Sequence, residues 1–130
     1  MKLVYPIIIT KTDDKKVPYL IKIPALNGLT QGTTIENSIQ MARDYIGLNI
    51  LDRQDDQEPI PESVYQLPVT QSSEITTLID VDIDEYRRKN DLKVVKKTLT
   101  IPNYLNKLGQ DNHINFSELL TNALKEKLGI

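Results

Sequence analysis

The last third of the chain, from Lys93 to Ile130, constrains the fold most strongly. It reads KVVKKTLTIPNYLNKLGQDNHINFSELLTNALKEKLGI and predicts one short strand followed by two helices. A strand needs a neighbour for its backbone N–H and C=O groups, and no second strand is predicted near this one. So short a module also has too little core to fold alone. Both difficulties disappear if two copies intertwine, pair their strands and share one core.

Alternation along the predicted strand separates its side chains into two sets. Lys96, Thr98 and Thr100 share one face, and Lys97, Leu99 and Ile101 share the other. Pro102 ends the strand and can open a helix of about residues 103–109. The second helix has the clearer pattern, with Asn115 as N-cap and an apolar stripe at helical spacing. The stripe consists of Phe116, Leu119, Leu120, Ala123, Leu124 and Leu128.

The segments KKTLTIP and NFSELL, with a short helix between them, resemble the ribbon-helix-helix family of DNA-binding dimers. The resemblance implies that the exposed ribbon face enters the major groove and reads bases through Lys96, Thr98 and Thr100. It implies phosphate contacts from Lys97 and from backbone N–H groups at Asn115, Phe116 and Ser117. Phe116 replaces a residue that is often basic in the family, so this contact depends on backbone. The dimer core would contain Leu99, Ile101, Leu119, Leu120, Ala123 and Leu124. The alternative is that residues 93–130 only pack on the preceding domain.

Composition excludes several classes of site. The chain has 130 residues, no cysteine and one histidine, so disulfides and thiolate zinc sites are excluded. His113 is expected in the loop between the last two helices. No apolar run is long enough for a membrane helix and no signal peptide is evident, which predicts a cytoplasmic protein without membrane contact.

Charge is distributed unevenly along the chain. Residues 93–130 hold six lysines against three acidic residues, a net +3, and because the whole chain carries −2 the remaining residues carry −5. A basic end suits nucleic acid, and an acidic body suits a basic protein partner.

The preceding residues predict a sheet covered by one helix. Strands are expected at residues 3–10, 18–23, 29–32 and 75–84, with Asn27-Gly28 as a turn and Pro6 at or near a sheet edge. Thr33 and Glu36 predict a capping box for a helix that continues to about Leu51. Residues 52–63 read as a mobile surface loop, and residues 84–90 as a charged connector.

Asp80, Asp82 and Asp84 are the carboxylates to weigh as a metal site. On a strand they would share one face at spacings of about 7 Å, too far apart for one small ion without other ligands. Glu85 and Asp91 do not fit an EF-hand loop either. The prediction is a solvated or partner-facing strand, with no metal and no cofactor.

The whole chain resembles the HicB antitoxins of HicA and HicB toxin-antitoxin pairs. The resembling segments are YPIIIT, PALNGLTQGTTIENSIQMARDYI and IDVDIDEYRRKNDLKVVKKTLTIP. The resemblance implies an α+β architecture. A β-β-β-α-β domain with a partial ribonuclease H fold would occupy residues 1–84, a connector 85–92, and a ribbon-helix-helix domain 93–130. Ala25 and Asn27 stand where relatives often have an acidic residue, and the first strand lacks a carboxylate, which argues against a surviving nuclease centre.

Three functions remain open. The first is a non-enzymatic antitoxin that neutralises a small mRNA-cleaving HicA-type toxin and represses its own operon through operator DNA, as a homodimer or higher oligomer. The second is a ribbon-helix-helix regulator whose N-terminal domain senses a ligand, and a large apolar pocket there would favour it. The third is a metal-dependent nuclease. For the antitoxin, residues 1 to about 88 are expected to suffice for neutralisation, and the toxin-binding residues are not assigned.

Overall fold

A computed structural model describes residues 1–91 and 93–130 of the chain. The chain divides into two compact units, Met1–Lys93 and Val94–Ile130. Residue 92, the last residue of the predicted connector, lies outside the described residues. In the part of the chain described, no helix is both long and apolar enough to cross a membrane.

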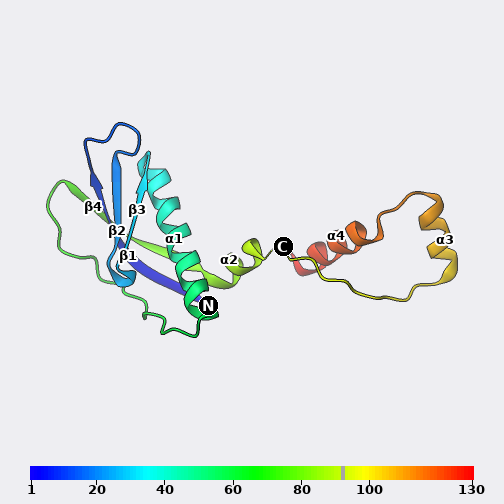
Figure 1. Ribbon diagram of the computed structural model, residues 1–130. Helices are drawn as coiled ribbons and strands as arrows, with labels where there is room; N and C mark the ends of the chain where they lie inside the picture. Colours follow the sequence, from blue (N-terminus) through cyan, green and yellow to red (C-terminus); the bar gives the residue numbers. More distant parts are fainter. Residues whose placement is uncertain (92) are drawn as a thin grey trace. The chain divides into compact units, whose positions relative to one another are not determined.

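The first unit is an antiparallel sheet with a long helix across one face (Figure 1). The strand order is β3-β2-β1-β4, and every neighbouring pair is antiparallel. The predicted succession β-β-β-α-β is therefore present, within a mixed α and β structure. Its elements are β1 (Lys2–Lys11), β2 (Tyr19–Ile23), the 3-10 turn η1 (Pro24–Leu26), β3 (Gly28–Gly32), α1 (Ile35–Asp55) and β4 (Glu74–Asp82).

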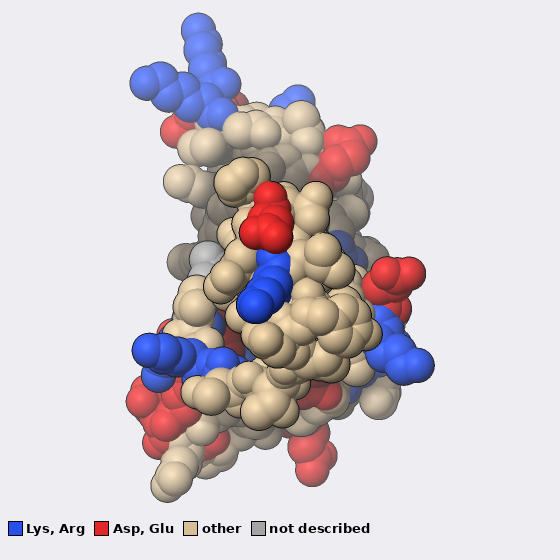
Figure 2. All heavy atoms as spheres, turned by 90° about the vertical axis from the view of Figure 1, so that its right-hand side faces the viewer, with Lys and Arg blue, Asp and Glu red and all other residues tan. Residues whose placement is uncertain are grey.

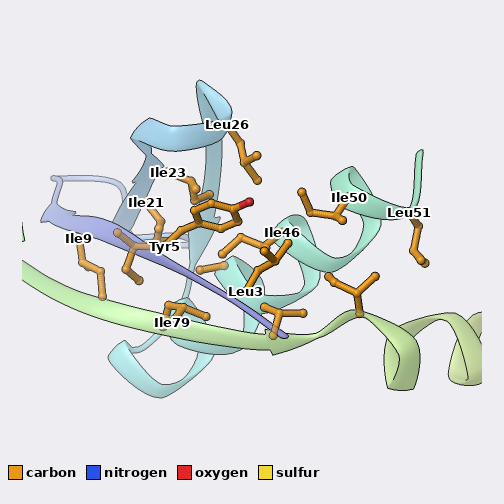
Figure 3. Close-up of a cluster of buried hydrophobic side chains, with 14 residues drawn as sticks. Leu3, Tyr5, Ile9, Ile21, Ile23, Leu26, Ile46, Ile50, Leu51 and Ile79 are labelled. Atoms are coloured by element: carbon orange, nitrogen blue, oxygen red, sulfur yellow. The ribbon is translucent and has the colours of Figure 1, made fainter. Parts of the chain in front are cut away.

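The core of this unit lies between α1 and the facing side of the sheet (Figure 3). Alternate residues of β1 point inward because strand side chains alternate. Tyr5 and Ile7 are fully buried there, and Ile46 of α1 is fully buried opposite them. Ala42 of α1 and Ile79 and Val81 of β4 are buried in the same core.

Pro6 occupies a position that needs no ladder hydrogen bond. β1 pairs with β4 along its length, from Lys2 opposite Asp82 to Thr10 opposite Glu74. It pairs with β2 only from Ile8 to Lys11. β1 is thus central in the sheet, and the expected edge position is correct only for its first half, where a proline costs nothing.

Residues 56–73 are attached to the half of β1 that β2 leaves open. The Tyr5 hydroxyl donates to the Pro61 carbonyl at 2.5 Å, and the Val4 N–H donates to Ser63 Oγ at 3.0 Å. The Val64 N–H donates to the Val4 carbonyl at 2.9 Å. The prediction of a mobile loop over residues 52–63 is wrong in two respects. Its first residues belong to α1, and its later ones hydrogen-bond to the sheet.

The start of α1 differs by one residue from the predicted capping box. Thr34 is the N-cap, and its hydroxyl accepts from the Asn37 N–H at 3.0 Å. Asn37 Oδ1 in turn accepts from the Thr33 N–H at 2.9 Å. Asn37, and not the predicted Glu36, is therefore the residue that reaches back across the start of the helix, although to the N–H that precedes the N-cap.

A helix, α2 (Ile83–Asn90), replaces the end of the predicted last strand and most of the predicted connector. Asp82 is its N-cap and accepts from the Glu85 N–H at 3.3 Å. Tyr86 packs against the core, and its ring lies so close to Gly47 that a Cβ there would come within 2.5 Å of it. The placement of Asp84 on a strand is therefore wrong, and residues 83–90 belong to the folded first unit.

The second unit contains α3 (Asn103–Asp111) and α4 (Phe116–Leu128), both close to their predicted bounds. Asn115 caps α4 as predicted, accepting from the Glu118 N–H at 3.1 Å. His113 lies in the turn between the helices, with φ of 56°. Residues 94–101 have no ladder in the single chain. Since the expected partner strand belongs to a second copy, the ribbon stays a prediction.

Candidate nucleic-acid and partner interfaces

The second unit has almost no core of its own. Within residues 94–130, all of which the structure describes, Gly109 is the one buried residue. Large apolar side chains remain open to solvent: Leu99 is 54% exposed and Leu119 is 56% exposed. Figure 2, viewed from the side of α3, shows a largely uncharged surface nearest the viewer. A unit in this state has little apolar burial to offset the entropy of ordering it.

An apolar groove of about 510 Å³ runs along this unit. Five of the six residues predicted for a dimer core line it, and the sixth, Leu124, is 51% exposed. The groove lining is Lys97, Leu99, Ile101, Asn106, Phe116, Ser117, Leu119, Leu120 and Ala123.

The segment that precedes α3 has two different sides. Lys97, Leu99 and Ile101 line the groove. The predicted base readers between them, Lys96, Thr98 and Thr100, are exposed and do not contribute to the groove lining. Alternate side chains of residues 96–101 therefore have different surroundings, although this segment is not paired with another strand. Lys97, predicted to contact phosphate, lies with the groove residues.

The N-terminus of α4 carries the other predicted phosphate contacts. The side chain of Asn115 is committed to the Glu118 N–H. The N–H groups of Phe116 and Ser117 belong to the first turn, where helical amides lack acceptors within their own helix. The Phe116 ring packs on Gly109, where a Cβ would come within 2.5 Å of it. Any anion contact at this position would therefore use backbone N–H groups.

The three aspartates of the first unit have three different environments. Asp80 lies on β4, where Arg43 of α1 donates from Nε to its carbonyl at 3.1 Å. Asp82 caps α2. Asp84 accepts a hydrogen bond from the Met1 amino group, which lowers the pKa of its carboxyl. Among the residues described, no group of three histidine or carboxylate side chains is arranged to hold a metal ion.

A charged region covers the junction of β4, α1 and α2. The Tyr86 hydroxyl donates a hydrogen bond to Asp44. Burial of the Tyr86 side chain and, as a smaller cause, this hydrogen bond raise the pKa of Tyr86. Arg43 lies 3.5 Å from the Asp80 carboxylate, and Lys89 lies 3.0 Å from Glu85. A hollow of about 380 Å³ here is lined mainly by charged side chains. Its chemistry does not suit an apolar ligand.

Sequence reasoning missed two features of the first unit. One is a pair of contacts: Arg43 of α1 bonds to Asp80 of β4, and Tyr86 of α2 bonds to Asp44 of α1. The single aromatic residue in IDEYRRKN was the sequence signal for the Tyr86 contact. The other is that β4 is a long strand at the sheet edge. Strand order is not visible in a pattern of alternating residues, so no local signal could have shown it.

Two solved structures resemble the chain over nearly its whole length. One belongs to a toxin-antitoxin complex from Streptococcus pneumoniae, with a TM-score of 0.60, 24% identity, and coverage of 98% of this chain and 99% of that one. The other is the antitoxin HicB from Burkholderia pseudomallei, with a TM-score of 0.53, 21% identity, and coverage of 98% and 97%. No protein-family model matches the chain, and no curated protein matches it. At these identities the likeness establishes a shared fold, which extends over both units.

Proposed function

We propose that this chain is the antitoxin of a toxin-antitoxin pair. It binds and neutralises a small mRNA-cleaving toxin of the HicA type through its first unit and represses its own operon through its second. The observation that carries this proposal is the likeness to an antitoxin HicB and to a chain of a toxin-antitoxin complex, with both units included. A fold alone does not determine function, so the surfaces of each unit must support the assignment.

The first unit supports a role in binding a basic protein. It is acidic, with a net charge of −5 over residues 1–92, and a toxin that holds RNA needs Lys and Arg for the phosphate backbone. Its core is filled by its own side chains. The hollow between β4, α1 and α2, beside Arg43 and Tyr86, has a mainly charged lining. A small-ligand sensor would need an apolar pocket, and the charged hollow beside Arg43 does not provide one.

The second unit supports dimerisation. Its two helices are short enough to be marginal in isolation, and their apolar side chains are open to solvent. A second copy would cover the groove, pair residues 96–101 with their equivalents and bury Leu99, Ile101 and Leu119 in a shared core. The same pairing would form the two-stranded ribbon of a ribbon-helix-helix domain.

Promoter recognition follows from the ribbon. Pairing through residues 96–101 with the groove side inward leaves Lys96, Thr98 and Thr100 on the outer face, where a ribbon can enter the major groove. The first-turn amides of α4 would then contact phosphates, whereas Lys97 lies on the groove side of the segment. The net charge of +3 over residues 93–130 suits this surface to DNA.

Copurification tests the toxin half of the proposal. The full chain is expressed with the small reading frame beside it, untagged, and the purified pair is assayed for RNA cleavage before and after the toxin is separated. We expect the separated toxin to cleave RNA and the pair to be inactive. A toxin that neither copurifies nor loses activity when the chain is added back would refute the assignment.

A triple variant, Lys96→Ala with Thr98→Ala and Thr100→Ala, tests the DNA half. Each good base contact contributes about 1–3 kcal/mol, so promoter binding in a gel shift should be lost. Toxin inhibition should be unchanged, because none of the three residues lies in the first unit. Wild-type promoter affinity in the triple variant would show that these residues do not read bases.

A further inference from the structure

The free edge of β4 has a defined hydrogen-bonding pattern. The Ile83 N–H donates to the Met1 carbonyl at 2.9 Å, which continues the β1 ladder one pair beyond Lys2 and Asp82. In an antiparallel ladder, hydrogen-bonded pairs alternate with pairs that are not hydrogen-bonded. Because Ile83 belongs to a bonded pair, the backbone groups of the odd-numbered residues of β4 bond to β1. The even-numbered residues Thr76, Leu78 and Asp80 therefore direct their backbone groups away from the sheet. Arg43 reaches the Asp80 carbonyl from that side, in agreement with this assignment.

Most of this edge lacks the features that usually prevent pairing with another strand. β4 has nine residues, contains neither lysine nor proline, and pairs with β1 in one unbroken register without a bulge. Ile75 is 46% exposed and Leu78 is 38% exposed. Arg43 blocks only the end nearest α2. At the other end, the Glu74 N–H donates to the Gln71 carbonyl at 3.0 Å, so the open template for an added strand runs from Ile75 to Ile79.

The opposite edge of the sheet is a weaker template. β3 has five residues and begins and ends with glycine. Its bonded pairs with β2 include Thr30 opposite Ile21, so only Leu29 and Gln31 direct backbone groups outward. Leu29 is nonetheless comparable with Leu78: each is an exposed leucine whose N–H faces away from the sheet.

Charge selects the occupant of the β4 edge. Glu74, Asp80 and Asp82 have their side chains on the sheet face opposite α1, as alternation from the buried Ile79 and Val81 requires. If two copies paired antiparallel about Leu78, Glu74 would lie opposite Asp82 of the other copy, and like charges directly opposite are destabilising. A strand with basic side chains at these positions would instead be attracted.

We propose that the edge of β4 from Ile75 to Ile79 binds an extended, basic segment of the toxin as a fifth strand of the sheet. This inference rests on the proposed function and adds the location and the mode of toxin binding. Backbone hydrogen bonds to Thr76 and Leu78 hold the segment, and the Glu74 carboxylate favours lysine or arginine on the face opposite α1.

Amide hydrogen exchange in the full chain, with and without the copurified HicA-type toxin, tests the mode of binding. The amides of Thr76 and Leu78 should exchange rapidly in the free chain and slowly in the complex. Those of Thr77 and Ile79 should be slow in both, because β1 already protects them. Unchanged exchange at Thr76 and Leu78 in a stable complex would overturn the inference. Protection of both amides without toxin, increasing with protein concentration, would also overturn it and identify a second copy as the occupant.

Matched proline variants test the location. Leu78→Pro and Leu29→Pro each remove an outward N–H and no ladder bond, one on each sheet edge. Leu78→Pro should raise the toxin Kd by at least about tenfold, and Leu29→Pro should change it by less than about twofold. Equal Kd values for wild type and both variants would overturn the inference while the proposed function stands. If the wild-type chain binds no toxin, both fail together. If Leu78→Pro does not fold, the exchange measurement on wild type decides.

Discussion

The two units differ in where their apolar side chains lie. In the first unit, the inward faces of the sheet and α1 form a continuous core in which Tyr5, Ile7 and Ile46 are fully buried. In the second, the helix stripe is equally regular in sequence, but Leu119 and Leu124 remain more than half exposed. Similar amphipathic patterns thus have different outcomes, because one unit contains both layers of its core and the other contains only one. We propose that a second copy supplies the missing layer of the second unit.

This difference predicts two kinds of stability. A unit with its own core unfolds with a free energy that does not depend on protein concentration. A unit completed by a second copy is stabilised by mass action, so its unfolding shifts with concentration. The following substitutions compare the two units, from the largest expected effect to the smallest.

Ile46→Ala removes a fully buried side chain from the first unit. The expected loss is about 2–5 kcal/mol of unfolding free energy, because the cavity adds to the lost burial. Denaturant unfolding of the full chain, followed by resolved NMR signals of β1, measures it at two protein concentrations. The loss should be the same at both. A loss that varied with concentration would break the comparison, because the first unit would then also depend on a partner.

Leu119→Ala makes a related change in the second unit. If the side chain is buried only in a dimer, the loss should be about 1.5–3 kcal/mol per chain and should appear as a weaker dimer. Sedimentation over a range of concentrations measures the dissociation constant, and β1 signals should not change. An unaltered dissociation constant would place Leu119 outside the shared core.

Two glycines in close contact with aromatic rings sharpen the comparison. A Cβ at Gly47 would meet the near side of the Tyr86 ring, which the Asp44 hydrogen bond and burial hold in place. Gly47→Ala should therefore destabilise the first unit by about 1–3 kcal/mol despite the better helix propensity of alanine. At Gly109 the Cβ would meet the far end of the Phe116 ring, which is 40% exposed and can move. Thermal unfolding should show a smaller loss for Gly109→Ala, and the reverse order would contradict these packing differences.

The smallest expected effect is a pH dependence confined to the first unit. Burial raises the pKa of both Tyr5 and Tyr86 in the folded chain. Their neutral forms are therefore favoured by folding. Their contribution is complete below the unfolded pKa of about 10 and is lost as the pH rises above it. Unfolding free energies between pH 8 and pH 11 should decline at the alkaline end, and less steeply in Tyr86→Phe. An equal decline in that variant would mean that Tyr86 does not contribute.

Sequence patterns predicted the parts of this fold that are determined locally. Runs rich in Ile, Val and Tyr located β1 and β2, the dipeptide Asn27-Gly28 marked the turn, and the spacing of Leu119, Leu120 and Ala123 located α4. These signals arise within one element, so they can be read without the rest of the chain.

The features that were missed depend on contacts between distant segments. α2 has one aromatic residue, and its docking on Gly47 depends on a glycine in another helix. Residues 61–64 hydrogen-bond to Val4 and Tyr5. The backbone groups of Val4 are available for these bonds because β2 pairs with β1 only from Ile8 onward. Of the groove residues, Leu119, Leu120 and Ala123 belong to the helical stripe that periodicity predicted. The open edge of β4 was not predicted, since edges belong to the sheet and not to the strand.

Sedimentation of the full chain tests most directly whether a second copy completes the second unit. Wild-type protein at micromolar concentration should be a dimer or a higher oligomer. Leu120→Asp should be a monomer, because an unpaired charge in the shared core costs several kcal/mol, and its β1 signals should match wild type. A wild-type chain that is monomeric while α3 and α4 are folded, or a Leu120→Asp variant that stays dimeric, would contradict this account.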